Sequence, residues 1–341
     1  MSTKDRNGSR GSEVLVIQPL PGIGDMVWHL GHLRAIAAAA PGGRVDILAK
    51  PRSQADRLLA AEPSVQRVLW LERDGGAHDG FAGLFRLAAL LRAGTYSSAW
   101  ILHGSWRYGL AACLAGIPLR VGYGSGLQRL FLNGPILPRA AYGGAHAIER
   151  ATGLLEANGL APARDGPPLA LLPAARARVQ ARFGHLPEPW IALGIGSSEP
   201  FKQWGRVNFA ALAKSLGRVA GQTLFLLGGP AEAAMAGWIE RRARDAGAAA
   251  ESAAALPLED ALALTARCRI YLGNDTGMMN AAVALGVQAI GLFGGSPTLG
   301  HSPLIHPLVP VDDGAGMAGI SVDQVLSALR GLAPECCPAS P

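Results

Sequence analysis

Residues 266–293, ARCRIYLGNDTGMMNAAVALGVQAIGLF, contain the stretch that decides the fold. The apolar run over residues 269–273 predicts a short buried strand that stops at turn-forming residues. The alanine-rich residues 278–285 predict a helix that is buried on most faces and is ended by Gly286. A second apolar run, residues 289–293, predicts another strand. The three elements form one β-α-β unit with its polar residues at one end.

The polar residues of this unit, Asp275, Thr276 and Gly277, lie where the predicted helix begins. A helix N-terminus carries unpaired N–H groups and about half a positive charge, which suits a phosphate or a diphosphate. Thr276 and Gly277 would offer such an anion a hydroxyl and an unobstructed backbone. Asp275 repels an anion, so its expected partners are sugar hydroxyls. The alternative is that Asp275 or Thr276 only caps the helix.

A second polar turn separates the first predicted strand from the first predicted helix. Residues 13–20 predict a buried strand, and residues 26–40 predict one helix. The turn between them, Gly22-Ile23-Gly24-Asp25, has two glycines of a dinucleotide-binding fingerprint but lacks the third. Gly24 lets the backbone approach a ligand closely. Asp25 is either a helix N-cap or a general base that takes a proton from an attacking sugar hydroxyl.

Strand and helix patterns alternate along the chain, which predicts an α/β protein with mostly parallel sheets and helices on both faces. Residues 120–123 lead into a looped region over residues 124–144, and the Pro-, Gly- and Ala-rich residues 159–173 indicate the exit from a first domain. We expect a disordered tail over residues 1–12, Rossmann-like domains over 13–172 and 173–333, and a second tail over 334–341. The other expected strands are 44–49, 65–70, 99–102, 190–194 and 223–227, and the other expected helices are 54–61, 81–92, 108–115, 147–158, 174–183, 207–219, 259–266 and 322–332.

The start of the second predicted domain carries a third polar turn. Ser197, Ser198 and Lys202 follow the strand at 190–194, and two hydroxyls with a compact cation would suit a diphosphate. The alternative is an ordinary loop with a capping serine and a solvated lysine. Glu232, after the strand at 223–227, is a candidate for ribose hydroxyls or else a first-turn helix charge.

Composition restricts the class of protein. The chain has 341 residues, of which 49% are apolar and 16% charged, enough for two cores. Its four cysteines have no zinc or redox spacing, which favours a reduced, cytoplasmic protein. No apolar segment reaches about 18 residues, so we expect neither a signal peptide nor a membrane span. The net charge of +6 favours an anionic partner, but the dispersed basic residues argue against nucleic acid.

With these motifs in view, the sequence resembles the heptosyltransferase family, glycosyltransferase family nine. Three motifs carry the resemblance: Gly22-Ile23-Gly24-Asp25, Ser197-Ser198 with Lys202 and Trp204, and Gly273-Asn274-Asp275-Thr276-Gly277 with the following Ala281 to Gly286. The resemblance implies a GT-B fold, in which two Rossmann-like domains have parallel sheets facing across a cleft. It also implies an inverting transferase that uses a nucleotide-activated heptose, commonly ADP-heptose, and an acceptor in the lipopolysaccharide inner core.

The resemblance also implies roles for single residues. Asp25 matches the family's general base, and Asp275 matches a position that contacts the donor sugar. Diphosphate contacts are implied for Ser197, Ser198, Lys202, Thr276 and Gly277, and a ribose contact for Glu232. No cofactor is implied, and no residue cluster has metal-ligand spacing beyond the pair His29 and His32 at i, i+3, so we expect metal-independent turnover. The implied partners are a nucleotide sugar and a lipid-linked glycan, which allows peripheral contact with the inner face of the cytoplasmic membrane.

The chain departs from the family pattern at Asn280, where the family usually has histidine. Asn280 stays a candidate donor-binding residue because asparagine still forms hydrogen bonds, but it cannot carry a positive charge, so any charge that histidine lends to the departing diphosphate is absent. The segment Trp28-His29-Leu30-Gly31 also differs, which points to an unusual acceptor. Three other classes stay open on sequence: a transferase with a different donor or acceptor, a catalytically silent nucleotide-sugar-binding protein, and a nicotinamide dehydrogenase.

Overall fold

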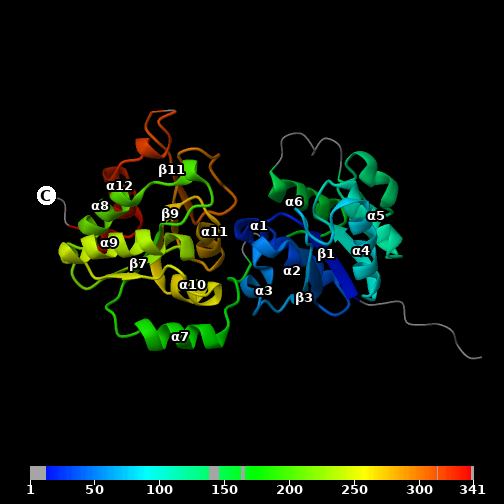
Figure 1. Cartoon of the computed structure of the whole chain (residues 1–341), viewed down its shortest axis with the longest axis horizontal. Helices are drawn as coiled ribbons and strands as arrows, with labels where there is room; N and C mark the ends of the chain where they lie inside the picture. The colour runs from blue at the N-terminus through cyan, green and yellow to red at the C-terminus, as the bar shows by residue number, and fades with distance from the viewer. Residues whose placement is uncertain (1–12, 138–145, 163–165, 313, 339–341) are drawn as a thin grey trace, which may run out of the picture. The chain divides into compact units, whose positions relative to one another are not determined.

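The chain forms two compact units, Met1–Pro167 and Pro168–Pro341 (Figure 1). The division falls inside the Pro-rich residues 159–173. The computed structural model describes residues 13–137, 146–162, 166–312 and 314–338. The expected tail over 1–12, residues 138–144 of the expected loop and the last three residues therefore lie outside the described residues.

Unit 1 contains a five-stranded parallel sheet with the order β3-β2-β1-β4-β5. Its central strand, β1, pairs with β2 on one side and with β4 on the other. The chain first builds the sheet toward β3 and then crosses to β4 and β5, so it changes direction between β1 and β4. The strands are β1 (Glu13–Gln18), β2 (Val45–Ala49), β3 (Val65–Trp70), β4 (Tyr96–Ile101) and β5 (Leu119–Gly122).

Helices cover the faces of this sheet. Leu15 and Ile17 of β1 share one buried cluster with Leu84 and Leu87 of α4 and Ala111 of α5. Because alternate residues of a strand point to opposite faces, this cluster covers only one side of the sheet. The helices are α1 (Ile23–Trp28), α2 (Leu30–Ala39), α3 (Ala55–Leu58), α4 (Gly80–Arg92), α5 (Trp106–Leu114) and α6 (Ala147–Ala157), with 3-10 turns η1 (Pro51–Ser53) and η2 (Gly126–Phe131).

Unit 2 contains a six-stranded parallel sheet with the order β11-β10-β9-β6-β7-β8. Its chain runs from β6 outward to β8 and then returns to the opposite side at β9, so the change of direction lies between β6 and β9. The strands are β6 (Trp190–Gly194), β7 (Thr223–Leu227), β8 (Ala250–Ser252), β9 (Cys268–Asn274), β10 (Ala289–Leu292) and β11 (Ile305–Leu308).

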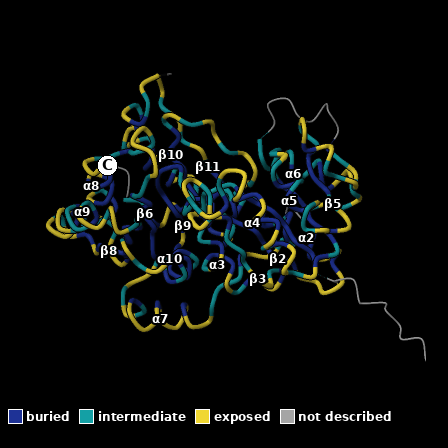
Figure 2. The backbone as a smooth tube through the Cα atoms, turned by 45° about the vertical axis from the view of Figure 1, so that its right-hand side comes forward, coloured by how far each residue is buried: buried dark blue, intermediate teal, exposed yellow. Residues whose placement is uncertain are grey.

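The two faces of this sheet pack against different helices. Ile191 and Leu193 join a buried cluster with residues of α8, α9 and α12, whereas Trp190, one residue before Ile191, meets the ring of Phe225 edge to face, and Phe225 also contacts Phe183 of α7. Figure 2 shows the strands buried and the outer helix faces exposed. The helices are α7 (Pro173–Phe183), α8 (Arg206–Leu216), α9 (Ala233–Asp245), α10 (Leu258–Thr265), α11 (Gly277–Ala284) and α12 (Val322–Leu332), with 3-10 turns η4 (Pro200–Lys202), η5 (Pro230–Glu232), η6 (Gly316–Gly319) and η7 (Pro334–Cys336).

The predicted α/β class with two parallel sheets is confirmed, but several elements differ from expectation. The single helix expected over 26–40 begins earlier, at Ile23, and is broken at His29. Strands β5, β8 and β11 fall in segments that the sequence did not assign as strands. Residues 334–338, expected as a tail, include η7, in which Cys336 is fully buried in the core of unit 2.

Candidate active site

The carboxyl ends of β6 and β9 lie side by side, with Gly194 and Gly273 paired in register. The chain leaves these two strands in opposite directions along the sheet, and such a switch point opens the crevice in which parallel α/β sheets bind ligands. The loop after β6 contains Ser197 and Lys202, and the turn after β9 contains Asp275 and Thr276. Two of the three polar turns predicted from sequence are therefore brought together in unit 2.

Asn274, the last residue of β9, holds these two turns in contact. Its buried amide donates to the carbonyl oxygens of Ile195 (3.2 Å) and Gly196 (3.0 Å). Its oxygen accepts the Trp204 N–H at 3.1 Å. Since a buried amide with satisfied donors and acceptor is costly to displace, Asn274 fixes the loop after β6 against β9. No role of its own was predicted for this residue from the sequence.

Lys202 and Asp275 form an ion pair across the two turns. Lys202 Nζ lies 2.6 Å from Asp275 Oδ2, and the Ser296 hydroxyl donates to the same oxygen at 2.7 Å. Ser296 follows β10, the next strand of the sheet, and was missed from sequence although it lies two residues after Gly294. The ammonium group has three N–H donors, so the ion pair leaves it donors for a further anion.

Thr276 is the N-cap residue of α11, and Gly277 is the first residue of that helix. Within the described residues, the Thr276 side chain makes no hydrogen bond to the first turn of the helix. Its hydroxyl is 3.5 Å from that of Tyr271. Asn280 is buried and donates from Nδ2 to the Thr276 carbonyl at 3.0 Å. The first turn of α11, with its N–H groups, therefore starts next to the ion pair of Lys202 and Asp275. The side chain of Asn280 stabilises this turn through its bond to the Thr276 carbonyl.

The remaining predicted residues of unit 2 follow the same edge of the sheet. The Ser197 hydroxyl donates to the Glu199 carbonyl at 2.7 Å, while Ser198 is exposed. Glu232 Oε2 accepts the Gly229 N–H at 2.7 Å. A Cβ atom placed on Gly196 would lie 3.7 Å from the same carboxylate oxygen, so Glu232 borders the loop after β6.

Asp25 in unit 1 is the third residue of α1, and Gly22 is the N-cap. Its Oδ2 accepts the Gly22 N–H at 2.7 Å. The alternative that Asp25 is the N-cap is therefore wrong, because Gly22 is the N-cap. The Asp25 carboxylate nevertheless accepts a hydrogen bond from an N–H group at the start of the helix. Gly24 is buried in the same turn. Asp25 follows β1 and so lies at the edge where unit 1 changes direction between β1 and β4.

The helix break at His29 holds the main chain of Asp25. The His29 N–H donates to Met26 instead of to Asp25, which would be its partner in a regular helix. The Asp25 carbonyl instead accepts from Gln18 Nε2 at 3.1 Å and from His29 Nδ1 at 2.7 Å. Because a carbonyl only accepts, Nδ1 must carry the proton of a neutral ring. Burial lowers the pKa of His29 to about 4, which keeps the ring neutral.

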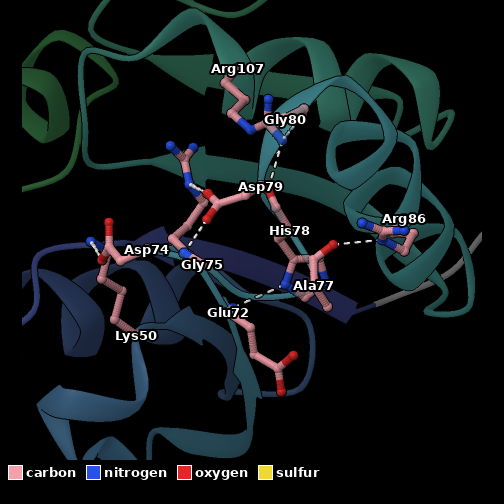
Figure 3. A network of polar contacts seen from close by, with 11 residues as sticks. Lys50, Glu72, Asp74, Gly75, Ala77, His78, Asp79, Gly80, Arg86 and Arg107 are labelled. Atoms are coloured by element: carbon pink, nitrogen blue, oxygen red, sulfur yellow. Dashed lines mark hydrogen bonds and ion pairs between the residues drawn. The ribbon is translucent and has the colours of Figure 1, made fainter.

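Basic residues gather at the same edge of unit 1, around His103 after β4. Burial is the main reason why the pKa of His103 is lowered, and the positive charges of Lys50, Arg150 and Arg73 add to it. Figure 3 shows Lys50 near Asp74, and their ion pair is 2.9 Å long. Arg73 is likewise paired with Asp79 at 2.7 Å, so two of these three cations already have an acidic partner.

Neither a metal cluster nor a membrane helix is found among the residues that the structure describes. No group of three or more His, Cys, Asp or Glu side chains within the described ranges could hold a metal ion. His29 and His32 have ring centroids 5.5 Å apart, and both are buried. In the same ranges, each helix is too short or too polar to cross a bilayer.

A parallel sheet with a polar helix start at its switch point, joined in one chain to a second parallel sheet with an acidic turn, is the architecture of GT-B glycosyltransferases. Comparison with known proteins agrees with this class and gives the family. Residues 84–309 match glycosyltransferase family 9 (heptosyltransferase), and the chain belongs to this family. The protein is a glycosyltransferase, as the resemblance implied.

Relatives and solved structures extend the match over most of the chain. The chain is 28% identical over 310 residues to lipopolysaccharide heptosyltransferase 2 of Salmonella typhimurium, with 86% of each chain covered. It is 27% identical to the enzyme of the same name from Escherichia coli, again with 86% of each covered. The E. coli ADP-heptose lps heptosyltransferase II structure matches with a TM-score of 0.76 at 24% identity, covering 94% of this chain and 98% of that one. A Veillonella parvula family 9 structure has a TM-score of 0.77 at 22% identity, covering 96% and 99%.

Proposed function

We propose that this protein transfers a heptose from ADP-heptose to a lipopolysaccharide inner-core acceptor. Family membership and the names of the Salmonella and E. coli relatives support this donor and acceptor. The observation that carries the proposal is the placement of Lys202, Asp275 and Thr276 at one switch point. A cation and a helix N-terminus suit a diphosphate, and a neighbouring carboxylate suits sugar hydroxyls.

The proposed reaction is a direct displacement with inversion at the anomeric carbon. The acceptor hydroxyl oxygen bonds to that carbon as the bond to the diphosphate oxygen breaks, the hydroxyl proton passes to Asp25, and ADP leaves. Lys202 and the first turn of α11 stabilise the negative charge that develops on ADP. Ser197, Ser198 and Gly277 would add hydrogen bonds to the diphosphate, and Gly24 would let the main chain before the base approach the donor closely.

Two other residues have supporting roles in this proposal. Glu232 would accept hydrogen bonds from the ribose hydroxyls, since its carboxylate borders the loop after β6. Asn280 would not touch the diphosphate as a charged group; it would keep the first turn of α11 in place through its bond to the Thr276 carbonyl. A lipid-linked acceptor would bring the enzyme to the inner face of the cytoplasmic membrane.

Substitution of the proposed base tests the function. Asp25→Asn keeps an acceptor for the Gly22 N–H, so we expect the fold and the affinity for ADP to persist. Turnover should fall by roughly 10²- to 10⁴-fold, the usual contribution of a general base. ADP release from ADP-heptose with a purified inner-core acceptor measures turnover, and calorimetry measures ADP affinity.

The matched control is Asp56→Asn, which removes an exposed carboxylate from α3 of the same unit. It should leave turnover unchanged. Undiminished turnover in Asp25→Asn would remove Asp25 from the role of base. Absence of transfer in the unsubstituted protein with ADP-heptose, but transfer with another nucleotide sugar, would overturn the proposed donor.

A further inference from the structure

One surface of unit 1 exposes large hydrophobic side chains from three neighbouring elements. On α4, Phe81 is 75% exposed and Phe85 55%, and their ring centroids are 6.2 Å apart. On η2, Leu127 is 60% exposed and Leu130 73%. Trp106, the first residue of α5, is also exposed. Soluble domains rarely expose several such side chains together without a partner for them. We call these five residues the apolar face.

Hydrogen bonds hold the starts of the three elements together. Arg107 Nη2 of α5 donates to the Gly80 carbonyl of α4 at 2.7 Å, a contact shown in Figure 3. Gln128 Nε2 of η2 donates to the Ser105 carbonyl, just before α5, at 3.1 Å. Phe81, Trp106 and Leu127 are the sequence neighbours of these bonded residues. The three elements that carry the apolar face are therefore held next to one another.

The charge of the segment that builds this face is entirely positive. Residues 80–148 contain no Asp or Glu, although the chain has 25 acidic residues among 341 and a segment of this length would carry about five at the average frequency. The same segment contains six arginines. They are Arg86, Arg92, Arg107, Arg120, Arg129 and Arg139.

Three of the described arginines of the segment donate hydrogen bonds to main-chain carbonyl oxygens. Arg86 donates to the Ala77 carbonyl at 2.6 Å, as Figure 3 shows, and Arg120 donates to the Phe131 carbonyl at 2.7 Å. Arg92 likewise donates to the Leu114 carbonyl. Carbonyl oxygens are neutral, so these bonds fix the guanidinium groups without cancelling their charge. Exposed aromatic and leucine side chains on a segment that also carries such cations are typical of a surface that lies in the interface of an anionic membrane.

We propose that the apolar face docks on an anionic lipid bilayer. Phe81, Phe85, Leu127 and Leu130 enter the headgroup region, and the arginines contact lipid phosphates. The inference rests on the proposed function in one respect: an enzyme with a lipid-linked acceptor finds that acceptor at the membrane. A partner protein would not require a segment without acidic residues. Anionic headgroups repel acidic side chains, so a surface that binds an anionic bilayer is more stable there without them.

The experiment is flotation of the full-length protein with vesicles of phosphatidylcholine alone or mixed with phosphatidylglycerol. We expect binding to the mixed vesicles, weakened by salt. The double variants Phe81→Ser with Phe85→Ser, and Leu127→Ser with Leu130→Ser, should each lose at least tenfold in vesicle affinity. Thermal unfolding checks the fold of each, and the two pairs lie on different elements, so one remains informative if the other fails to fold.

The matched control replaces two equally exposed hydrophobic residues of unit 2, Val207 (67% exposed) and Val311 (77%), by serine. This control should bind vesicles like the unsubstituted protein. Equal binding to neutral and anionic vesicles, or unchanged binding in both apolar-face variants, would overturn the proposal. Self-association that the same substitutions abolish, without vesicle binding, would also overturn it and identify an interface between copies.

Transfer to a delipidated, water-soluble acceptor separates this inference from the proposed function. If transfer persists while vesicle binding is absent, the docking surface is wrong and the proposed function stands. If vesicle binding persists while transfer from ADP-heptose is absent, the proposed function is wrong. In the apolar-face variants, transfer to the soluble acceptor should remain unchanged.

Discussion

Acidification should destabilise unit 1 because two buried histidines are neutral in the folded protein. Burial lowers the pKa of His29 to about 4 and that of His32 to about 3, from an ordinary value of 6.5. In the part of the chain that the structure describes, His29 Nε2 and His32 Nδ1 are buried without a hydrogen-bond partner. His146, whose ring packs against Trp28, adds electrostatic repulsion to a charged His29.

The sign and size of the effect follow from proton linkage. Below pH 6.5 the unfolded chain binds a proton on each histidine, while the folded unit binds none until the pH approaches the lowered pKa values. Stability is therefore lost as the pH falls from about 6.5 toward about 4, by roughly 1.4 kcal/mol per pH unit for each histidine. From about pH 7.5 to about pH 5, the two histidines together should remove about 4 kcal/mol.

Urea unfolding of the full-length protein at both pH values, followed by hydrogen exchange of the α1 and α2 amides, measures this loss. His32→Gln keeps a group near Thr152, with which His32 Nε2 shares a 3.0 Å hydrogen bond, and should remove about half of the pH-dependent loss. The exposed His185 of unit 2 provides the control, since His185→Gln should leave the loss unchanged. An equal loss in His32→Gln and in the unsubstituted protein would refute the reasoning.

Three other substitutions test the site. Lys202→Ala should weaken ADP binding by about 10- to 100-fold in calorimetry, because a charge-assisted hydrogen bond contributes about 1.5–3 kcal/mol. Gln18→Leu removes one of the donors to the Asp25 carbonyl and should lower kcat in steady-state assays while ADP affinity persists. Gly194→Ala should lower the free energy of unfolding of unit 2 by about 1–3 kcal/mol in urea titrations, because a Cβ atom there would lie 1.7 Å from the Tyr271 hydroxyl oxygen.

Each of these substitutions has a control or a contradicting result. Lys214→Ala, on the exposed side of α8, should leave ADP affinity intact. Gly237→Ala should not destabilise unit 2, because the nearest atom to a Cβ there is 3.6 Å away, in a flexible arginine. A Gln18→Leu variant with normal kcat would show that its bond to Asp25 matters only for folding.

The central strands were predictable from sequence, whereas most edge strands were not. β1, β6, β7 and β9 are buried on both faces and therefore read as apolar runs. β5, β8 and β11 lie at sheet edges, are only partly buried and include charged residues or Pro307. Edge strands have one unpaired side and tolerate such residues, so their pattern resembles that of a loop.

The helix break at His29 could not be predicted from the local sequence pattern either. Residues 23–40 have no proline or glycine at the break, and helical periodicity continues across it. The break depends on the contacts of Gln18 and His29 with the Asp25 carbonyl, and Gln18 lies on a different element. A contact that forms only after β1 and α1 are packed together leaves no signal in a local pattern.

The sequence identified the polar turns of the site but not the residues that join them. Lys202, Asp275 and Thr276 were predictable because they follow buried strands. Asn274 and Ser296 were missed, since their roles come from strand order: β9 lies between β6 and β10 only in the folded sheet. Whether these side chains act on a donor stays a prediction for the experiments above.

The pairing of Lys202 with Asp275 has a consequence for selectivity. An inorganic phosphate or chloride ion could satisfy the lysine only by approaching the aspartate, whose negative charge repels it. A nucleotide sugar brings diphosphate oxygens for the ammonium group and hydroxyl hydrogens for the carboxylate, so both members of the pair gain partners at once. The enzyme would thereby discriminate against the simple anions that outnumber its donor in the cell.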